Sequence, residues 1–184
     1  MPTSTRVYDG FVKVDKVETS LGIREVVRVT DSVAMLVHNI TRDELLLVEQ
    51  VRVPMIGPEN DDGSLLEVAA GRFDVDLPLK DLIRQELEEE LGISDVGDND
   101  IVILNHGKPL ALSPGVLTER QYLAYVKVGT LQINPKKRRF GTAGEDIERH
   151  FVSVRGLNPA VATFGDLKTW ALIEWFFRHQ DCLP

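Results

Sequence analysis

The chain has 184 residues, with 21 lysines and arginines against 29 aspartates and glutamates, and a formal net charge of −8. Hydrophobic residues make up 43% of it, which is too apolar for a disordered chain, and its length suits one domain, so we expect a single domain over residues 1–184. The acidic balance argues against nucleic acid as the main partner, no apolar run approaches the ~18–20 residues of a membrane span, and the single cysteine excludes an intrachain disulfide and a cysteine-built zinc site.

The first residues, 1–6, are polar and contain no apolar signal core, so we expect a cytoplasmic protein without a membrane segment. Residues 7–17 and 23–29 then alternate in part between apolar and polar side chains, which predicts strands. These strands carry more apolar side chains than the edge of a monomer usually exposes. We therefore assign residues 1–32 to an N-terminal antiparallel strand extension and expect it to pair two copies of the chain in a homodimer.

The remainder, residues 33–184, is predicted to form the core from several strands and two helices. Strands are expected at the short apolar or alternating stretches 33–37, 45–48, 101–104 and 121–128. Helical spacing of apolar residues predicts one helix at 79–91 and a second at 166–179, with Asp166 as the N-cap. Many strands with a central and a late helix are typical of an α+β domain in which a mixed sheet is sandwiched between helices.

Three glutamates lie on or beside the apolar face of the helix predicted at 79–91. On a helical wheel, Glu86 and Glu90 fall inside the arc of leucines and isoleucine, and Glu89 lies at its edge. Glutamate runs on helices are usually solvated, but carboxylates on a buried face repel one another and resist burial. A divalent cation offsets both effects, and an all-oxygen ligand set suits Mg²⁺ or Mn²⁺ better than zinc. We therefore expect a Mg²⁺ or Mn²⁺ site on this helix.

The spacing around the same helix resembles the Nudix box of the Nudix hydrolase superfamily. That motif reads G-x5-E-x7-R-E-U-x-E-E-x-G-U, where U is a bulky aliphatic residue. Residues 71–93 match it at Gly71, Glu86, Leu87, Glu89, Glu90, Gly92 and Ile93. Two positions depart, since Leu77 stands where the motif has glutamate and Gln85 where it has arginine. The resemblance implies the Nudix fold, with its mixed sheet between helices.

Sequence on both sides of the box resembles the branch of ADP-ribose and nucleoside-diphosphate-sugar pyrophosphatases. The resembling stretches are residues 47–54, 66–71, 112–120 and 144–148. The resemblance implies that the Ala70 carbonyl joins Glu86, Glu89 and Glu90 as metal ligands, and that Glu145, together with Glu89, acts on the attacking water. It also implies substrate contacts from Arg52, Ser113, Gly115 and Glu119. The neighbouring acids Asp146 and Glu148 compete with Glu145 for the catalytic role.

The activity implied is a metal-dependent pyrophosphohydrolase, in which water cleaves the diphosphate of ADP-ribose or a related nucleoside-diphosphate sugar into a nucleoside monophosphate and a sugar phosphate. The departures at Leu77 and Gln85 leave a second reading open, a non-catalytic or weakly active ligand-binding or sensor domain of the same fold. A third reading takes the basic run at 136–139 as a nucleic-acid contact, but four charges in an acidic chain more often form a solvated loop. The residues do not choose the base or the sugar.

Overall fold

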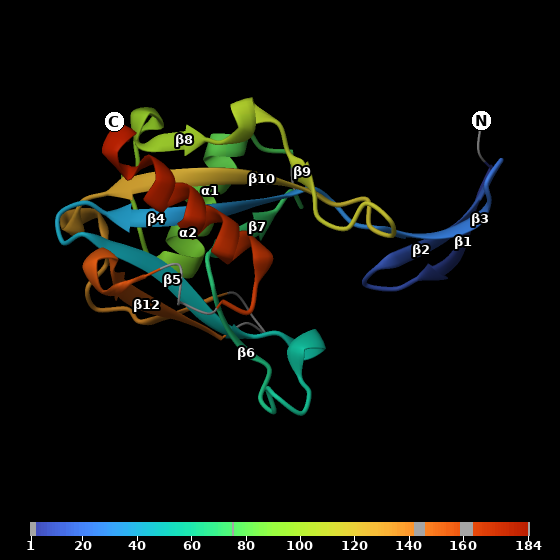
Figure 1. Cartoon of the computed structure of the whole chain (residues 1–184), viewed down its shortest axis with the longest axis horizontal. Helices are drawn as coiled ribbons and strands as arrows, with labels where there is room; N and C mark the ends of the chain where they lie inside the picture. The colour runs from blue at the N-terminus through green and yellow to red at the C-terminus, as the bar shows by residue number, and fades with distance from the viewer. Residues whose placement is uncertain (1–2, 75, 142–145, 159–163, 184) are drawn as a thin grey trace.

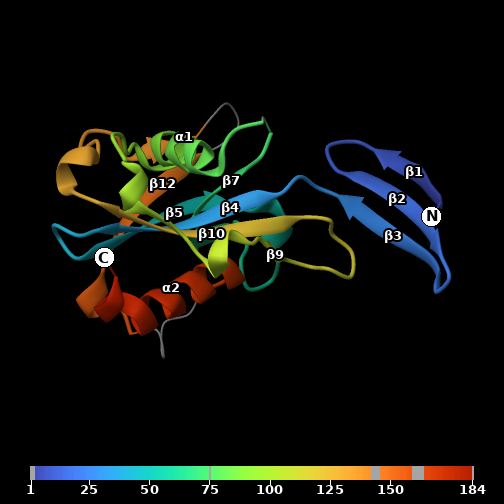
Figure 2. The same ribbon diagram turned by 90° about the horizontal axis from the view of Figure 1, so that it is seen from above.

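The computed structural model describes residues 3–74, 76–141, 146–158 and 164–183 of the chain (Figure 1). In these residues a nine-stranded sheet lies between two α-helices, and a separate three-stranded sheet projects from one end of it (Figures 1 and 2). The large sheet contains parallel and antiparallel pairs, whereas the small sheet is antiparallel. The predicted α+β class, with a mixed sheet between helices and antiparallel strands at the N-terminus, is confirmed.

The small sheet is a meander of β1 (Thr3–Asp9), β2 (Lys13–Thr19) and β3 (Gly22–Arg28). The stretch predicted as one strand at 7–17 is broken by a turn, in which the Gly10 N–H donates to the Val12 carbonyl oxygen at 3.2 Å. Its most buried side chain is the carboxylate of Asp15, which accepts from Arg28 Nε at 2.9 Å and from Arg6. This sheet is therefore held by strand pairing and a charged cluster more than by an apolar core.

In the large sheet the strands follow the order β11-β12-β5-β4-β10-β8, while β6, β7 and β9 pair with β5, β4 and β10. The pair of β4 and β10 is parallel, and the other described pairs are antiparallel. The strands are β4 (Ser32–Asn39), β5 (Glu44–Val51), β6 (Ser64–Glu67), β7 (Ala69–Arg72), β8 (Ile101–Ile103), β9 (Leu110–Ala111), β10 (Arg120–Val128), β11 (Arg139–Phe140) and β12 (Ile147–Ser153). Short 3-10 helices in the connections are η1 (Val53–Met55), η2 (Asp98–Asp100), η3 (Asn105–Gly107), η4 (Thr130–Gln132), η5 (Val154–Gly156) and η6 (Gln180–Cys182).

The two helices, α1 (Leu79–Leu91) and α2 (Leu167–His179), agree with the predicted ranges and cover opposite faces of the sheet (Figure 2). Asp166 is the N-cap of α2, as predicted, and its side chain accepts from the Thr169 N–H at 2.9 Å. At the other end of α1, Gly92 adopts a left-handed conformation (φ 63°) and its N–H donates to Glu88. The motif glycine Gly92 is thus the residue that ends the helix.

Alternate residues of β4 enter two different cores. Val33, Met35 and Val37 pack in the core under α1, while Ala34 and Leu36 pack in the core under α2. All of them are fully buried. A strand covered on both faces has no polar alternation, which is why this segment is a continuous apolar run in the sequence. The described part of the chain contains no helix with the length and hydrophobicity that crossing a bilayer requires.

Candidate functional site

The carboxylate of Glu90 lies between α1 and β7 and is the central feature of the candidate site. Its side chain is buried, with the residue 8% exposed, and its Oε2 accepts the Ala70 N–H at 3.1 Å. Burial, and after it the nearby negative charge of Glu86, raise the pKa of Glu90 to about 8. No lysine or arginine among the described residues forms an ion pair with this carboxylate. A cation bound beside this carboxylate from outside the chain would stabilise its ionised form.

Gly71 brings the backbone of β7 against the second carboxylate, that of Glu86. A Cβ atom at position 71 would lie 2.0 Å from both Oε1 and Cδ of Glu86, so only glycine leaves room for this carboxylate. Glu86 and Glu90 are one helical turn apart and interact electrostatically. The glycine of the sequence motif and its two glutamates thus form one structural unit.

The backbone of Ala70 adds a carbonyl oxygen to the two carboxylates of the candidate site. Ala70 stands opposite Ala34 of β4, yet its N–H is directed to Glu90 and not across the ladder. In an extended strand the carbonyl of a residue points to the same side as its N–H, so the Ala70 carbonyl also faces away from β4. Two carboxylates and a carbonyl fit a hard divalent cation such as Mg²⁺ or Mn²⁺. Within the described ranges no three acidic, histidine or cysteine side chains converge as metal ligands, so water or substrate oxygens would fill the remaining positions.

Glu89 lies beside this unit and is held by a neighbour on the same helix. Gln85 Nε2 donates to Glu89 Oε1 at 3.0 Å. The glutamine therefore orients Glu89 through a neutral hydrogen bond, at the position where the motif has an arginine. The roles predicted for Glu89, as a metal ligand and as a group acting on water, stay predictions.

A buried ionic network adjoins the carboxylates and includes Arg52. Glu67, only 1% exposed, accepts from Arg52 Nε at 2.6 Å and from the ammonium of Lys168. Lys168 also lies 3.0 Å from Asp166 at the start of α2. The charge of Arg52 favours the ionised form of Glu90, and that of Glu67 opposes it. The sequence predicted Arg52 as a substrate contact but did not predict its ion pair with Glu67. The only sign of Glu67 in the sequence is a single acid inside a mostly apolar stretch.

Replacing Glu67 by glutamine should lower the free energy of unfolding by about 2 kcal/mol, because Arg52 and Lys168 would lose the charge of their shared, buried partner. Chemical denaturation of the two proteins measures the difference. Glu59→Gln, which removes an exposed acid in a surface loop, is the matched control and should change stability by less than about 0.5 kcal/mol. Equal losses in both variants would contradict a structural role for the network.

The other predicted substrate contacts, Ser113, Gly115 and Glu119, lie on the segment between β9 and β10. Glu119 Oε1 accepts from Ser32 Oγ at 2.7 Å. Ser113 and Gly115 are exposed in the β9–β10 loop, which reaches toward the N-terminal sheet (Figure 1). There the Val27 N–H of β3 donates to Val116 at 2.8 Å. The structure thus ties this loop to β3, and a substrate contact from it stays a prediction.

Glu145, the predicted catalytic residue outside the helix, lies outside the described residues. Its two competitors are both engaged with arginines. Asp146 forms an ion pair with Arg139, and Glu148 lies 3.6 Å from both Arg138 and Arg139. The arginines in these pairs are largely exposed, so the pairs are weak, and the choice among the three acids stays a prediction.

The raised pKa of Glu90 predicts how the stability of the metal-free protein depends on pH. The folded-state pKa of about 8 exceeds the usual carboxyl value, so the folded state binds more protons than the unfolded state between the two values. Glu90 therefore lowers the free energy of unfolding as pH rises from about 4.5 to about 8. In a chelator, Glu90→Gln should be at least about 1 kcal/mol more stable than the parent at pH 9 and equally stable at pH 4. Thermal unfolding at both pH values checks this, and a pH-independent difference would contradict it.

Comparison with known proteins gives partial matches in sequence and a nearly complete match in structure. No protein-family model matches the chain. It is 38% identical over 96 residues to the GDP-mannose pyrophosphatase of Salmonella paratyphi B, which is 52% of this chain and 47% of that protein. The corresponding enzyme of Pectobacterium atrosepticum is 35% identical over 98 residues, covering 53% and 47%. The chain therefore spans about half the length of these curated relatives.

The structure is similar to a solved protein described as an ADP compounds hydrolase, with a TM-score of 0.69 over 97% of this chain and 95% of that one. Sequence identity is 20%, so this likeness establishes the fold alone. Together with the distant homology to GDP-mannose pyrophosphatases, it confirms the resemblance to the Nudix superfamily that the motif predicted.

Proposed function

We propose, from this distant homology and the geometry of α1, that the chain is a divalent-cation-dependent pyrophosphohydrolase acting on nucleoside-diphosphate sugars or ADP-ribose. The observation that carries the proposal is the buried carboxylate of Glu90, which has no cationic partner among the described residues and is set beside Glu86 and the backbone of Ala70 and Gly71. A divalent cation between them would compensate the negative charges of the two carboxylates and of a bound diphosphate. The names of the relatives favour a nucleotide sugar within this substrate class.

In this proposal Glu86, Glu90 and the Ala70 carbonyl hold Mg²⁺ or Mn²⁺. Bound there, the cation would neutralise the diphosphate and lower the pKa of the attacking water. Glu89, oriented by Gln85, faces the water or adds a further ligand. We assign Glu145 to accept the proton of the water.

The substrate-binding residues of the proposal are Arg52, Ser113, Gly115 and Glu119. The Nε of Arg52 is occupied by Glu67, and the remaining donors of its guanidinium are assigned to a phosphate oxygen. In the reaction, the water oxygen bonds to one phosphorus and the anhydride P–O bond breaks. Its electron pair leaves with the second phosphate, which yields a nucleoside monophosphate and a sugar phosphate.

A substrate panel with product identification tests the proposal. ADP-ribose, ADP-glucose, GDP-mannose, a diadenosine polyphosphate and NADH would each be incubated with the protein and Mg²⁺, and the products separated by chromatography. We expect monophosphate release from at least one nucleotide sugar, and its loss in a chelator. Absence of products across the panel at high protein concentration, with either metal, would overturn the proposal.

The same panel separates hydrolysis from the sensor reading that Leu77 and Gln85 leave open. The hydrogen bond from Gln85 to Glu89 favours catalysis, because it keeps Glu89 oriented without an arginine. Calorimetric titration of the panel compounds measures binding independently of turnover. Tight, metal-dependent binding without any product would support a ligand-binding domain instead.

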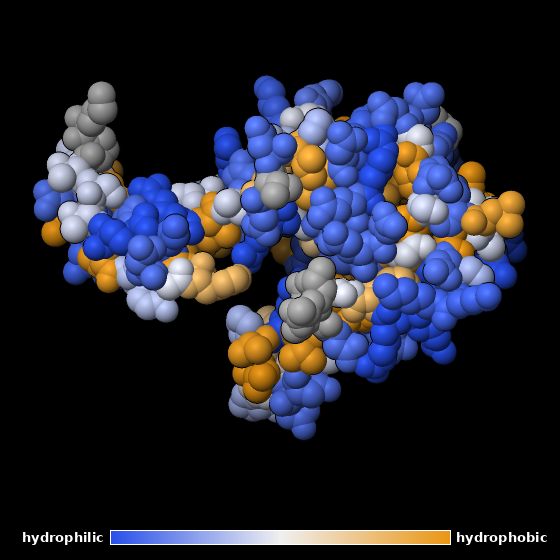
Figure 3. All heavy atoms as spheres, turned by 180° about the vertical axis from the view of Figure 1, so that it is seen from behind, coloured by the Kyte–Doolittle hydropathy of each residue, from blue (hydrophilic) through white to orange (hydrophobic). Residues whose placement is uncertain are grey.

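We also propose that the N-terminal sheet mediates a homodimer. This sheet stands apart from the body of the molecule and has apolar residues on its surface (Figure 3). Its exposed apolar side chains are Val7, Tyr8, Phe11, Val12, Leu21 and Ile23. A second copy of the chain would cover them.

Light scattering at micromolar concentration should therefore give twice the chain mass of 20.6 kDa. Phe11 is 89% exposed in the single chain, so Phe11→Asp should shift the mass toward one chain without unfolding it. A mass of one chain for the parent protein across this concentration range would contradict the proposal.

A further inference from the structure

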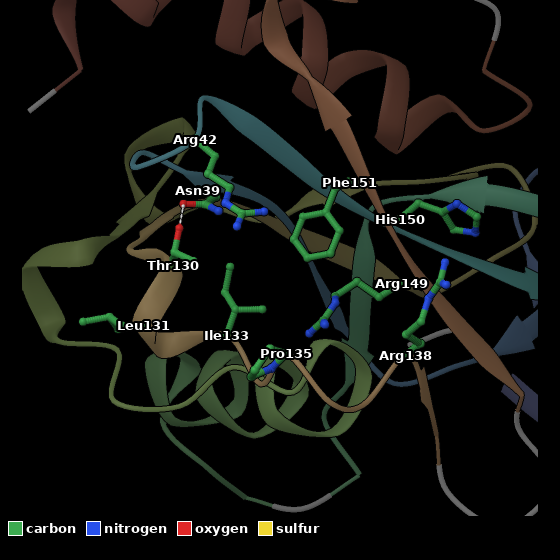
Figure 4. A pocket seen from close by; sticks show the side chains of 10 residues that line it. All are labelled: Asn39, Arg42, Thr130, Leu131, Ile133, Pro135, Arg138, Arg149, His150 and Phe151. Carbon is green, nitrogen blue, oxygen red and sulfur yellow. Dashed lines mark hydrogen bonds between the residues drawn. The ribbon is translucent and has the colours of Figure 1, made fainter.

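A cavity of about 640 Å³ opens at the end of the large sheet, between β12, the β4–β5 turn and the segment that follows η4. Its volume is in the range of small-molecule sites. Figure 4 shows Arg42, Ile133, Arg149 and Phe151 directed toward one shared space. The cavity is lined by the described residues 39, 42, 130, 131, 133, 135, 138 and 149–151, none of which is acidic. In a chain of net charge −8, a cavity lined by three arginines and no acid is a local reversal of charge.

Arg149 gives this cavity a buried positive charge. The residue is 4% exposed, and its guanidinium donates to the carbonyl oxygens of Leu91, Asn134 at 2.9 Å and Lys137 at 3.0 Å. No carboxylate among the described residues pairs with it, and its buried Nε has no hydrogen-bond partner there. Burial lowers the pKa of Arg149, and the charge of Arg138 lowers it further. Carbonyl partners leave its full charge uncompensated, which favours an anion nearby.

The two other arginines are available at the rim. Arg42 is exposed, and its side chain makes no ion pair with any described residue. Arg138 lies 3.6 Å from Glu148 and is largely exposed, so that this ion pair is weak. A ligand anion would therefore gain contacts with these guanidinium groups without displacing a buried partner.

Phe151 adds an uncovered aromatic surface. The preceding residues on the same face of β12, Ile147 and Arg149, are buried, but Phe151 is 45% exposed because α1 ends at Leu91 and does not reach it. The Arg149 guanidinium lies 5.0 Å from the ring centroid and stacks on one side of it. The rest of the ring and the neighbouring Ile133 face the cavity (Figure 4).

The cavity lies away from the carboxylates of the candidate site. Ala70 of that site stands opposite Ala34 near the start of β4, whereas the cavity is lined by Asn39 at the end of the same strand. Five residues of extended strand separate the two positions by about 17 Å. A ligand in the cavity therefore does not occupy the site on α1.

We propose that this cavity is a second binding site, for an organic phosphate monoester whose aromatic or other flat apolar group packs on Phe151 and whose phosphate lies among Arg42, Arg138 and Arg149. A guanidinium group can donate two N–H bonds to the oxygens of one phosphate. The exposed ring of Phe151 supplies a surface on which the apolar part of such a ligand can pack.

Phenyl phosphate is a suitable probe, because it has one phosphate, one ring and no anhydride bond. Titrations would follow the Nε–Hε signals of arginine by NMR in a chelator, so that no metal recruits phosphate to the carboxylates. We expect saturable shifts for Arg42 and Arg149, and binding at least about tenfold tighter than that of inorganic phosphate or phenol alone.

Arg42→Gln and Phe151→Ser should each weaken binding of phenyl phosphate by at least about tenfold. Both positions are exposed, and thermal unfolding confirms that the variants fold. Arg178→Gln, which removes one exposed arginine from α2, is the matched control and should leave binding unchanged. Equal affinity for phenyl phosphate and inorganic phosphate, or no weakening in either cavity variant, would overturn the proposal. Because the assay contains neither metal nor a nucleotide sugar, its outcome is independent of the proposed hydrolysis.

Discussion

Replacing Glu90 by glutamine should lower kcat/KM for the best nucleotide-sugar substrate by at least about two orders of magnitude, or about 2.7 kcal/mol of transition-state stabilisation. The substitution keeps the size of the side chain and can still accept the Ala70 N–H, but it removes the charge that a divalent cation requires. Because the charge of Glu90 is buried and lacks a cationic partner among the described residues, the metal-free fold should not be weakened.

Steady-state kinetics at several Mg²⁺ concentrations, with thermal unfolding of the same samples, measures both effects. Glu88→Gln is the matched control, since Glu88 is exposed on the same helix and differs from Glu90 in facing solvent. The control should keep activity within about twofold. Turnover like that of the parent at low Mg²⁺ in Glu90→Gln would reject the assignment of this carboxylate.

Substituting Gly71 by alanine should be nearly as damaging to activity, with a loss of at least about 100-fold. The new methyl group would lie 2.0 Å from the Glu86 carboxylate and must displace it from β7. The atom displaced is the end of a flexible, half-buried side chain, so the fold can adjust and the free energy of unfolding should change by less than about 1 kcal/mol.

Gly57→Ala is the control for this substitution. No atom of the described residues lies within 4 Å of a Cβ placed at Gly57, so the same chemical change there should leave both activity and stability unaltered. If Gly71→Ala keeps the activity of the parent, the position of Glu86 against β7 is not required for activity, and the proposed set of metal ligands is wrong.

The sequence was sufficient to predict the elements whose burial produces a regular pattern of apolar side chains. The run at residues 33–37 is apolar at every position because β4 is covered on both faces, and α1 shows a clear helical period because one of its faces is buried. β6 and β7 were not predicted as strands. They are four residues long, and β6 ends on the buried acid Glu67, so neither shows a hydrophobic alternation.

For the candidate site, sequence analysis placed Glu86 and Glu90 on one buried face and Gly71 in the same motif, and the structure brings these three together. It did not find the network of Glu67 with Arg52 and Lys168, because that network joins residues 101 positions apart along the chain. Nor did it find the cavity at Arg149. An arginine in a strand is predicted to lie on the surface, and the sequence does not show that Arg149 is buried beside the end of α1.

The parallel pairing of β4 with β10 also bears on how the chain reaches this fold. The paired residues are 89 positions apart along the whole ladder, from Ser32 with Gln121 to Asn39 with Val128. Closing so long a loop is entropically unfavourable, and topologies rich in such distant contacts fold slowly. During synthesis, β4 and β7 leave the ribosome before β10, so the edge of β4 that pairs with β10 stays unpaired until then. The helix that carries Glu86 and Glu90 packs against β4, β5 and β7, which precede it in the chain, and against β11 and β12, which follow β10, so its packing is complete only after β12 has been synthesised.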